Sequence, residues 1–194
     1  MHASDNALIE GLRQGDRATF DLVYDRYAGR IHGFLLRLVR DAATADDLAQ
    51  DTWMAFARAA GSLREGSDLA AFLFTIARNE ARSHRRWSLL DLLRLAAPER
   101  DDVCDPSPEL DLRLDAVRAG ERLERALGEL PPVHREPLLL ICVEGFDQAR
   151  VAEILELSPV ALRKRLSRAR AALAEALDRQ ERQQDRPLAG RSAR

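Results

Sequence analysis

Five basic side chains near the carboxyl end are the strongest candidates for a binding function: Arg163, Lys164, Arg165, Arg168 and Arg170. No acidic residue lies between Ala161 and Arg170, and apolar residues recur among the bases at helical spacing: Leu162, Leu166, Ala169 and Leu173. This pattern predicts a helix with one apolar and one basic face. Ser158 and Pro159 are typical of its first residues.

A second, shorter helix is predicted directly before this one, starting at Asp147, and only Glu156-Leu157 separates the two. Such a pair is typical of a helix-turn-helix that binds duplex DNA. The first turns of the second helix would then face base edges, through Ala161, Arg163, Lys164 and Ser167, while the other bases contact phosphates. The competing interpretation is a solvated arginine-rich face, because arginine is also a good helix former.

A second basic cluster lies in the first half of the chain and consists of Arg78, Arg82, Arg85 and Arg86. Aromatic and amide side chains are interleaved with it: Phe72, Phe74, Asn79 and Trp87. Unstacked bases need both an aromatic surface and a charged track, so this mixture suits a melted or single strand. Phe72 and Ile76 lie four positions apart, however, and packing in a helical core is the more common explanation of such aromatic residues.

An acidic stretch provides the third candidate, with no basic residue from Asp41 to Thr52. It contains Asp46, Asp47, Gln50 and Asp51 and is followed by Trp53. Acidic residues in a first helical turn favour the helix dipole, which accounts for Asp46 and Asp47 but not for Asp51. A docking face for a basic protein partner is therefore an equal alternative.

Residue patterns typical of catalysis or metal binding do not occur in the sequence. The four histidines show no HExxH or paired-ligand spacing, and there is neither a glycine-rich phosphate loop nor a G-x-S-x-G elbow. Cys104 and Cys142 lie far apart, outside any CxxC spacing. We therefore expect no enzyme, no metal site and no cofactor.

Composition and apolar periodicity predict the elements that position these clusters. The chain has 194 residues, 46% hydrophobic and 32% charged, with a net charge of only -2. No window approaches the apolar length of a membrane span, and no leader precedes the first helix, so we expect a cytoplasmic protein without membrane insertion. The sequence is rich in straight-chain helix formers, which predicts an all-α fold.

The predicted helices fall into two small domains. Helices over 6–13, 16–40, 44–60 and 67–95 form a helical bundle in domain 1–95, with Asp16 and Ser67 as caps and Thr44 opening the third helix through a capping-box-like pattern. Residues 96–114 carry three prolines and six acids and predict an acidic flexible linker. Domain 115–178 holds the helix-turn-helix, and 179–194 reads as a disordered polar tail.

Several motifs, in this order, resemble a bacterial sigma factor of the sigma-70 family, in the short extracytoplasmic-function (ECF) class. Any one of them is weak, and together they are specific. In the first half they are Ala18-Thr19-Phe20, Tyr24-Asp25-Arg26-Tyr27, the stretch 45–53 and the stretch 72–79. In the second half they are Leu130-Pro131, Arg135-Glu136, Glu144-Gly145, the stretch 151–155 and the stretch 165–170.

The resemblance implies a subunit that binds core RNA polymerase and directs it to promoter DNA. It gives Asp46, Asp47, Gln50, Asp51 and Trp53 the polymerase as partner. It assigns the melted minus-ten element to Phe72, Arg78, Asn79, Arg82, Arg85, Arg86 and Trp87, and the duplex minus-thirty-five element to the helix at 158–178. An anti-sigma factor is a further partner that the resemblance implies.

The sequence departs from the family pattern at several positions. Phe72 replaces a usual tryptophan, Val160-Ala161 replace a Gly-Thr pair, and Glu156 stands where the turn usually has a glycine. Ala149-Arg150 replace an acidic pair, and Pro137 must lie near a helix start or bend its helix. Two other readings remain: a dimeric helix-turn-helix regulator that acts without polymerase, and a protein-binding helical adaptor.

Overall fold

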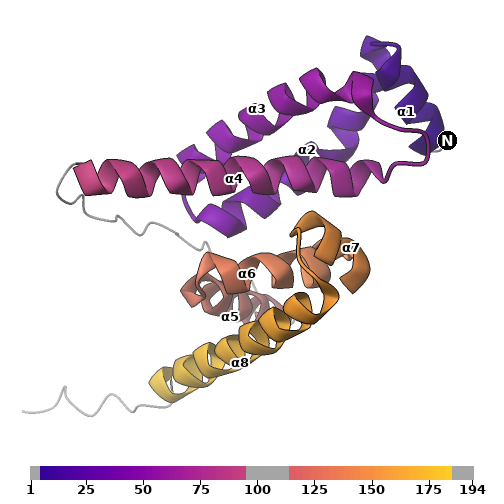
Figure 1. The fold of residues 1–194 in the computed structure, drawn as a ribbon. Helices are drawn as coiled ribbons and strands as arrows, with labels where there is room; N and C mark the ends of the chain where they lie inside the picture. Colours follow the sequence, from indigo (N-terminus) through magenta and orange to yellow (C-terminus); the bar gives the residue numbers. More distant parts are fainter. Residues whose placement is uncertain (1–4, 95–113, 185–194) are drawn as a thin grey trace, which may run out of the picture.

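The computed structural model describes residues 5–94 and 114–184, and within these ranges the chain is helical and contains no strand (Figure 1). The predicted all-α fold is confirmed. The proposed linker at 96–114 falls, apart from Leu114, outside the described residues, as do residues 1–4 and 185–194. None of the described helices is both long and apolar enough to cross a membrane.

The first group of helices contains α1 (Asp5–Arg13), α2 (Arg17–Val39), α3 (Ala42–Ala59), a short 3-10 turn (Ala60–Ser62) and α4 (Leu69–Arg94). The central helix α2 begins where the sequence predicts, because the Asp16 carboxylate accepts hydrogen bonds from the amides of Ala18 and Thr19 at 3.3 and 3.0 Å. Its buried stripe packs against α1, α3 and α4: Val23, Tyr27, Ile31, Phe34, Leu35 and Leu38.

Two helix starts differ from the prediction, in each case because an aspartate provides the cap. Helix α3 begins after Asp41, whose carboxylate accepts the Thr44 amide at 2.7 Å, so Thr44 lies inside the first turn. Helix α4 is capped by Asp68, which accepts the Ala71 amide at 2.8 Å. Ser67 instead accepts the amide of Arg64 in the preceding loop, at 3.2 Å.

The second group contains α5 (Leu114–Glu129), α6 (Pro132–Leu138), a π-helical turn (Leu139–Val143), α7 (Gln148–Ile154) and α8 (Pro159–Gln184). Asp147 and Ser158 cap α7 and α8 as predicted, accepting the amides of Arg150 and Ala161 at 2.7 and 3.2 Å. Pro137 lies inside α6 instead of at its start. The wider π turn follows it directly, a place where the loss of a backbone donor is accommodated.

Helix α8 continues beyond residue 178, so the predicted disordered tail is wrong for residues 179–184. Polar contacts with α5 explain the extension. Arg179 and Gln180 donate to the Glu129 carboxylate at 2.8 and 3.0 Å, and Arg122 pairs with Glu181 at 2.6 Å. These contacts order a segment whose composition alone resembles a frayed end.

The two groups of helices pack against each other, and Arg135 lies where they meet. Its side chain, in α6, donates to the carbonyls of Leu127, Gly128 and Leu130 in its own group. It also reaches the carbonyls of Arg37 and Leu38 at the end of α2, at 3.1 and 2.9 Å. Burial, with Arg40 nearby, lowers the pKa of Arg135 to about 10, which leaves its guanidinium charged at neutral pH.

Candidate nucleic-acid and protein interfaces

The basic face of α8 has the exposure that its spacing predicts. Leu162, Leu166 and Ala169 are buried against the rest of the second group. Five of the predicted DNA-binding residues are exposed: Arg163, Lys164, Ser167, Arg168 and Arg170. The other two, Ala161 and Arg165, are half-buried. The structure thus gathers the exposed positive charge of α8 on the side that its apolar residues leave free.

The turn that leads into α8 carries a glutamate in a conformation that favours glycine. Glu156 has φ 54°, and the amides of Glu156 and Leu157 donate to the carbonyls of Glu153 and Ala152 at 3.0 and 2.9 Å. This pattern is a Schellman cap with Glu156 at the left-handed position. A residue with a Cβ pays about 1 to 2 kcal/mol there relative to a right-handed conformation.

The aromatic residues of α4 belong to the hydrophobic core. Phe74 is fully buried and makes edge contacts with Phe34 and Phe146, with ring centroids 5.3 and 5.2 Å apart. Phe72 is half-buried and lies 6.3 Å from the ring of Phe56. Core packing therefore explains the presence of an aromatic residue at Phe74 fully and at Phe72 in part. Trp87 lies in α4, and its side chain is outside what the structure describes.

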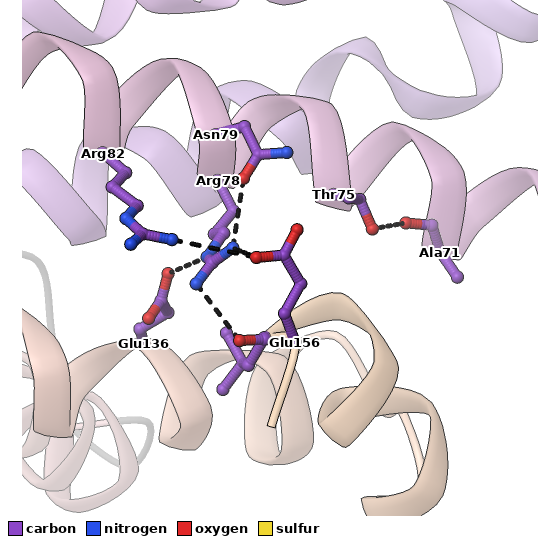
Figure 2. A network of polar contacts seen from close by, with 8 residues as sticks. Ala71, Thr75, Arg78, Asn79, Arg82, Glu136 and Glu156 are labelled. Atoms are coloured by element: carbon purple, nitrogen blue, oxygen red, sulfur yellow. Dashed lines mark hydrogen bonds and ion pairs between the residues drawn. The ribbon is translucent and has the colours of Figure 1, made fainter. Parts of the chain in front are cut away.

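Arg78 is the most enclosed member of the basic cluster on α4 and is not exposed as the strand-binding prediction requires. Its side chain is 7% exposed and contacts three elements (Figure 2). Its nitrogens lie 3.3 Å from Glu136 Oε1, 3.5 Å from Glu156 Oε2 and 3.2 Å from the Leu155 carbonyl oxygen. Asn79, which is exposed, accepts a further hydrogen bond from Arg78 at 3.1 Å.

The other bases of the α4 cluster remain accessible. Arg82 is 48% exposed and lies 3.8 Å from Glu156 Oε2, and Arg85 and Arg86 are exposed. Glu136 is the most enclosed acid opposite this cluster. Burial raises its pKa, and the opposing charges of Arg78, Arg165 and Arg85 act against that rise.

Glu136 and Glu156 were not among the predicted site residues. Glu156 was visible in the sequence as a departure from the usual glycine of the turn. The partnership of Glu136 with Arg78 spans 58 positions, and no local pattern indicates it.

The acidic face of α3 is exposed, and one predicted member does not belong to it. Asp46, Asp47, Gln50 and Asp51 all face solvent. Trp53 is 9% exposed and packs among the rings of Phe20, Tyr24 and Phe56 at 6.1, 4.8 and 5.8 Å. In this conformation Trp53 holds α2 against α3, and its contact with a protein partner stays a prediction.

The α3 acidic face borders an open groove between α3 and α4. The groove is lined by Asp47, Gln50, Asp51, Met54, Glu80 and His84, among others. Met54 is 44% exposed and adds an apolar contact that sequence reasoning missed. The Asp46 carboxylate, next to these residues in the sequence, lies 2.8 Å from His32 Nε2 of α2. An acidic groove that also contains the apolar side chains of Leu48 and Met54 suits a basic segment of another protein.

The part of the chain that the structure describes contains no group of three or more His, Cys, Asp or Glu side chains that could hold a metal ion.

The described residues present three charged surfaces: one acidic on α3, one basic and partly covered on α4, and one basic and exposed on α8.

Family profiles match both halves of the chain. Residues 23–87 match the profile described as Sigma-70 region 2, and residues 120–173 match the one described as Sigma-70, region 4. RNA polymerase sigma factor CarQ of Myxococcus xanthus is 34% identical over 172 residues, covering 87% of this chain and 95% of that protein. RNA polymerase sigma-H factor of Pseudomonas aeruginosa is 30% identical over 186 residues, covering 89% and 93%.

Solved structures show the same fold. The sigma factor RpoE, in complex with the anti-sigma factor NepR from Bartonella quintana, superposes with a TM-score of 0.69 at 29% identity, covering 82% of this chain and 96% of that one. CnrH in complex with the cytosolic domain of CnrY gives 0.65 at 25% identity, covering 90% and 97%.

Proposed function

Because the chain belongs to the ECF class of the sigma-70 family of RNA polymerase sigma factors, we propose that it binds core RNA polymerase and directs it to promoters by melting one DNA element and reading another. The observation that carries this proposal is the separation of charge into one acidic and two basic surfaces. A single partner of one charge sign would complement either the acidic surface or the basic surfaces, but not both. We further propose that it acts in the cytoplasm, without catalytic activity of its own.

Helix α8 is the proposed reader of duplex DNA at the minus-thirty-five element. Its exposed bases suit phosphate contacts, and its first turns carry Ala161, Arg163, Lys164 and Ser167, which would face base edges in a major groove. Arg165 is half-buried on the Glu136 side, and its proposed role is a phosphate contact at the edge of the helix. Residues 115–178 are the domain proposed for this step.

Helix α4 is the proposed strand-binding element at the minus-ten element, within domain 1–95. Asn79, Arg82, Arg85 and Arg86 offer one amide and three cations on its exposed side, which suits unpaired bases and their phosphates. Arg78 and Phe72 are also part of the proposed site and lie at its inner edge, where the side chains are less exposed. Trp87 remains a proposed stacking residue from its position after Arg86 in the sequence.

The acidic face of α3 is the proposed docking site for core polymerase, through Asp46, Asp47, Gln50 and Asp51. An anti-sigma factor is the second proposed protein partner, since the similar sigma factor RpoE of Bartonella quintana is in complex with the anti-sigma factor NepR. The proposed linker, residues 96–114, would allow the two DNA-binding domains to separate.

Run-off transcription tests the proposed function directly. Purified core RNA polymerase is incubated with genomic promoter fragments, with and without this chain. We expect discrete transcripts whose start sites depend on the chain. Absence of such transcripts, together with polymerase-independent binding of the chain to duplex DNA, would favour a dimeric helix-turn-helix regulator instead.

Two double variants test the division of labour between α3 and α8. Arg163→Ala with Lys164→Ala removes two exposed cations and should weaken promoter binding at least about tenfold while leaving polymerase affinity unchanged. Asp47→Ala with Gln50→Ala should weaken polymerase binding first. Arg17→Ala with Arg58→Ala removes the same charge from other exposed positions and is the control for the basic pair. Equal loss of both activities in each double variant would contradict the assignment.

A further inference from the structure

One part of the proposed strand-binding side of α4, around Arg78, is covered by the second group of helices. Figure 2 shows Arg78 directed away from α4 toward Glu136 of α6 and the α7–α8 turn, with Arg82 and Glu156 beside it. The Leu155 carbonyl accepts a third contact of the same guanidinium. Arg78 is thereby enclosed to 7% exposure of its side chain. A DNA strand cannot reach this guanidinium while the groups are packed together.

The covering arrangement is supported along the length of the interface. Ion pairs join Arg30 to Glu144 at 3.0 Å, Arg37 to Glu124 at 2.7 Å and Arg150 to Asp68 at 2.9 Å. The Phe74 and Phe146 rings add an edge contact. The closed state, in which the two groups of helices are packed together, therefore does not depend on the Arg78 contacts alone.

The chemistry of the covering groups resembles that of the DNA they exclude. Arginine binds carboxylate and phosphate oxygens with the same charge-assisted hydrogen bonds. Glu136 and Glu156 present carboxylate oxygens to Arg78, and Glu156 also faces Arg82. The two glutamates differ in burial, since 13% of the Glu136 side chain and 60% of the Glu156 side chain are exposed. Glu156 is therefore the part of the contact that solvent, salt and phosphate reach most easily.

Resting on the proposed role of α4, we propose that Glu136 and Glu156 act as internal competitors of the DNA strand. In the free chain their carboxylates occupy Arg78 and Arg82, and the strand contacts Arg78 only after the second group of helices moves away. The left-handed backbone of Glu156 supports this role. An acidic side chain stands at a position that favours glycine, and it is the side chain that reaches across to α4.

The experiment compares Glu156→Gln with Glu153→Gln in the full chain. Both variants remove one negative charge from the end of α7. Glu153 pairs only locally, with Arg150, in the described structure, whereas Glu156 pairs with α4. The radius of gyration is measured by small-angle X-ray scattering, and affinity for a short fluorescent single-stranded DNA is measured by anisotropy. For Glu156→Gln we expect a roughly two- to fivefold gain in strand affinity, as for loss of one exposed competing ion pair, with the radius of gyration unchanged because the other contacts still hold the closed state.

The outcomes separate this proposal from the proposed function. An unchanged strand affinity in Glu156→Gln, or an equal gain in Glu153→Gln, would overturn the competitor role, whatever the chain does with polymerase. Glu156→Gly is the second variant, since it removes the carboxylate and also the backbone strain. It should raise strand affinity as Glu156→Gln does while keeping helicity. Run-off transcription by the unchanged chain reports on the proposed function independently.

Discussion

Arg135 shows how a buried cation can be satisfied without a carboxylate. Only 5% of the residue is exposed, and its guanidinium donates to carbonyl oxygens at the carboxyl ends of two helices, α2 and α5. The carboxyl end of a helix leaves carbonyl oxygens without hydrogen-bond donors and carries a partial negative charge. The single guanidinium of Arg135 provides donors and a positive charge to two such ends. Arg40 supports the same place by donating to the Gly128 carbonyl at 3.0 Å. The residue joins the two groups of helices through backbone atoms.

Arg135→Met should therefore destabilise the fold strongly. The variant keeps an unbranched apolar stem but leaves several buried carbonyls without donors, and each such group costs about 1 to 3 kcal/mol. We expect the free energy of unfolding in urea to fall by at least about 3 kcal/mol. Arg125→Met, at an exposed position of α5, is the control and should change it by less than about 0.5 kcal/mol. Equal effects of the two variants would refute the bridging role.

At the scale of elements, side-chain caps determine where the helices of the first group begin. Asp16, Asp41 and Asp68 each accept an amide of the first turn that has no partner within its helix. Hydrogen bonds from the hydroxyl and amide of Thr19 lower the pKa of the Asp16 carboxyl below its ordinary value of 3.8, and Thr44 has the same effect on Asp41. These caps are therefore strongest when both carboxyls are ionised.

The α2 cap should be lost in acid. Because its pKa is lower in the folded chain than in the unfolded chain, Asp16 contributes stability that is fully present above 3.8 and is lost as pH falls through the lowered folded pKa. We expect hydrogen exchange of the Thr19 amide to accelerate across that range. Asp16→Asn keeps a hydrogen-bond acceptor that does not titrate. In this variant the protection of the Thr19 amide against exchange should therefore change less with pH than in the unchanged chain. A matched change, Asp25→Asn, lies outside the cap, and an identical profile in all three proteins would contradict the prediction.

The helices and most of their faces were predictable because their signals are local. Apolar periodicity over 16–40 and 158–173 and the caps at Asp16, Asp147 and Ser158 agree with the structure. The features that local signals do not predict depend on distant partners. Arg78 reads as a solvated cation until Glu136 is brought to it by packing, and α8 continues past residue 178 because α5 supplies acceptors and donors. No periodicity records such pairings.

At the scale of the whole molecule, the proposed binding surfaces differ in how accessible they are in the closed arrangement. Figure 1 shows α4 lying between α3 and α7. The acidic face of α3 is exposed in this state, while Arg78 on α4 is covered. A partner that binds a surface equally accessible in the closed and open states shifts the balance between them in neither direction. Docking through α3 and strand binding through α4 are thus separable steps, with opening between them.

This separation predicts additive effects on core polymerase binding. Glu156→Gln should leave the affinity of the chain for core polymerase within about twofold, because α3 is exposed in both states. Asp47→Ala with Gln50→Ala should weaken that affinity to the same extent whether or not Glu156 is also changed, since independent sites add within about 0.5 kcal/mol. The affinity for core polymerase is measured by fluorescence anisotropy of the labelled chain for four proteins: the unchanged chain, Glu156→Gln, the Asp47→Ala and Gln50→Ala double variant, and the variant that combines all three changes. A gain in polymerase affinity from Glu156→Gln that matches its gain in strand affinity would instead show that polymerase binds only the open chain, and that docking and opening are one step.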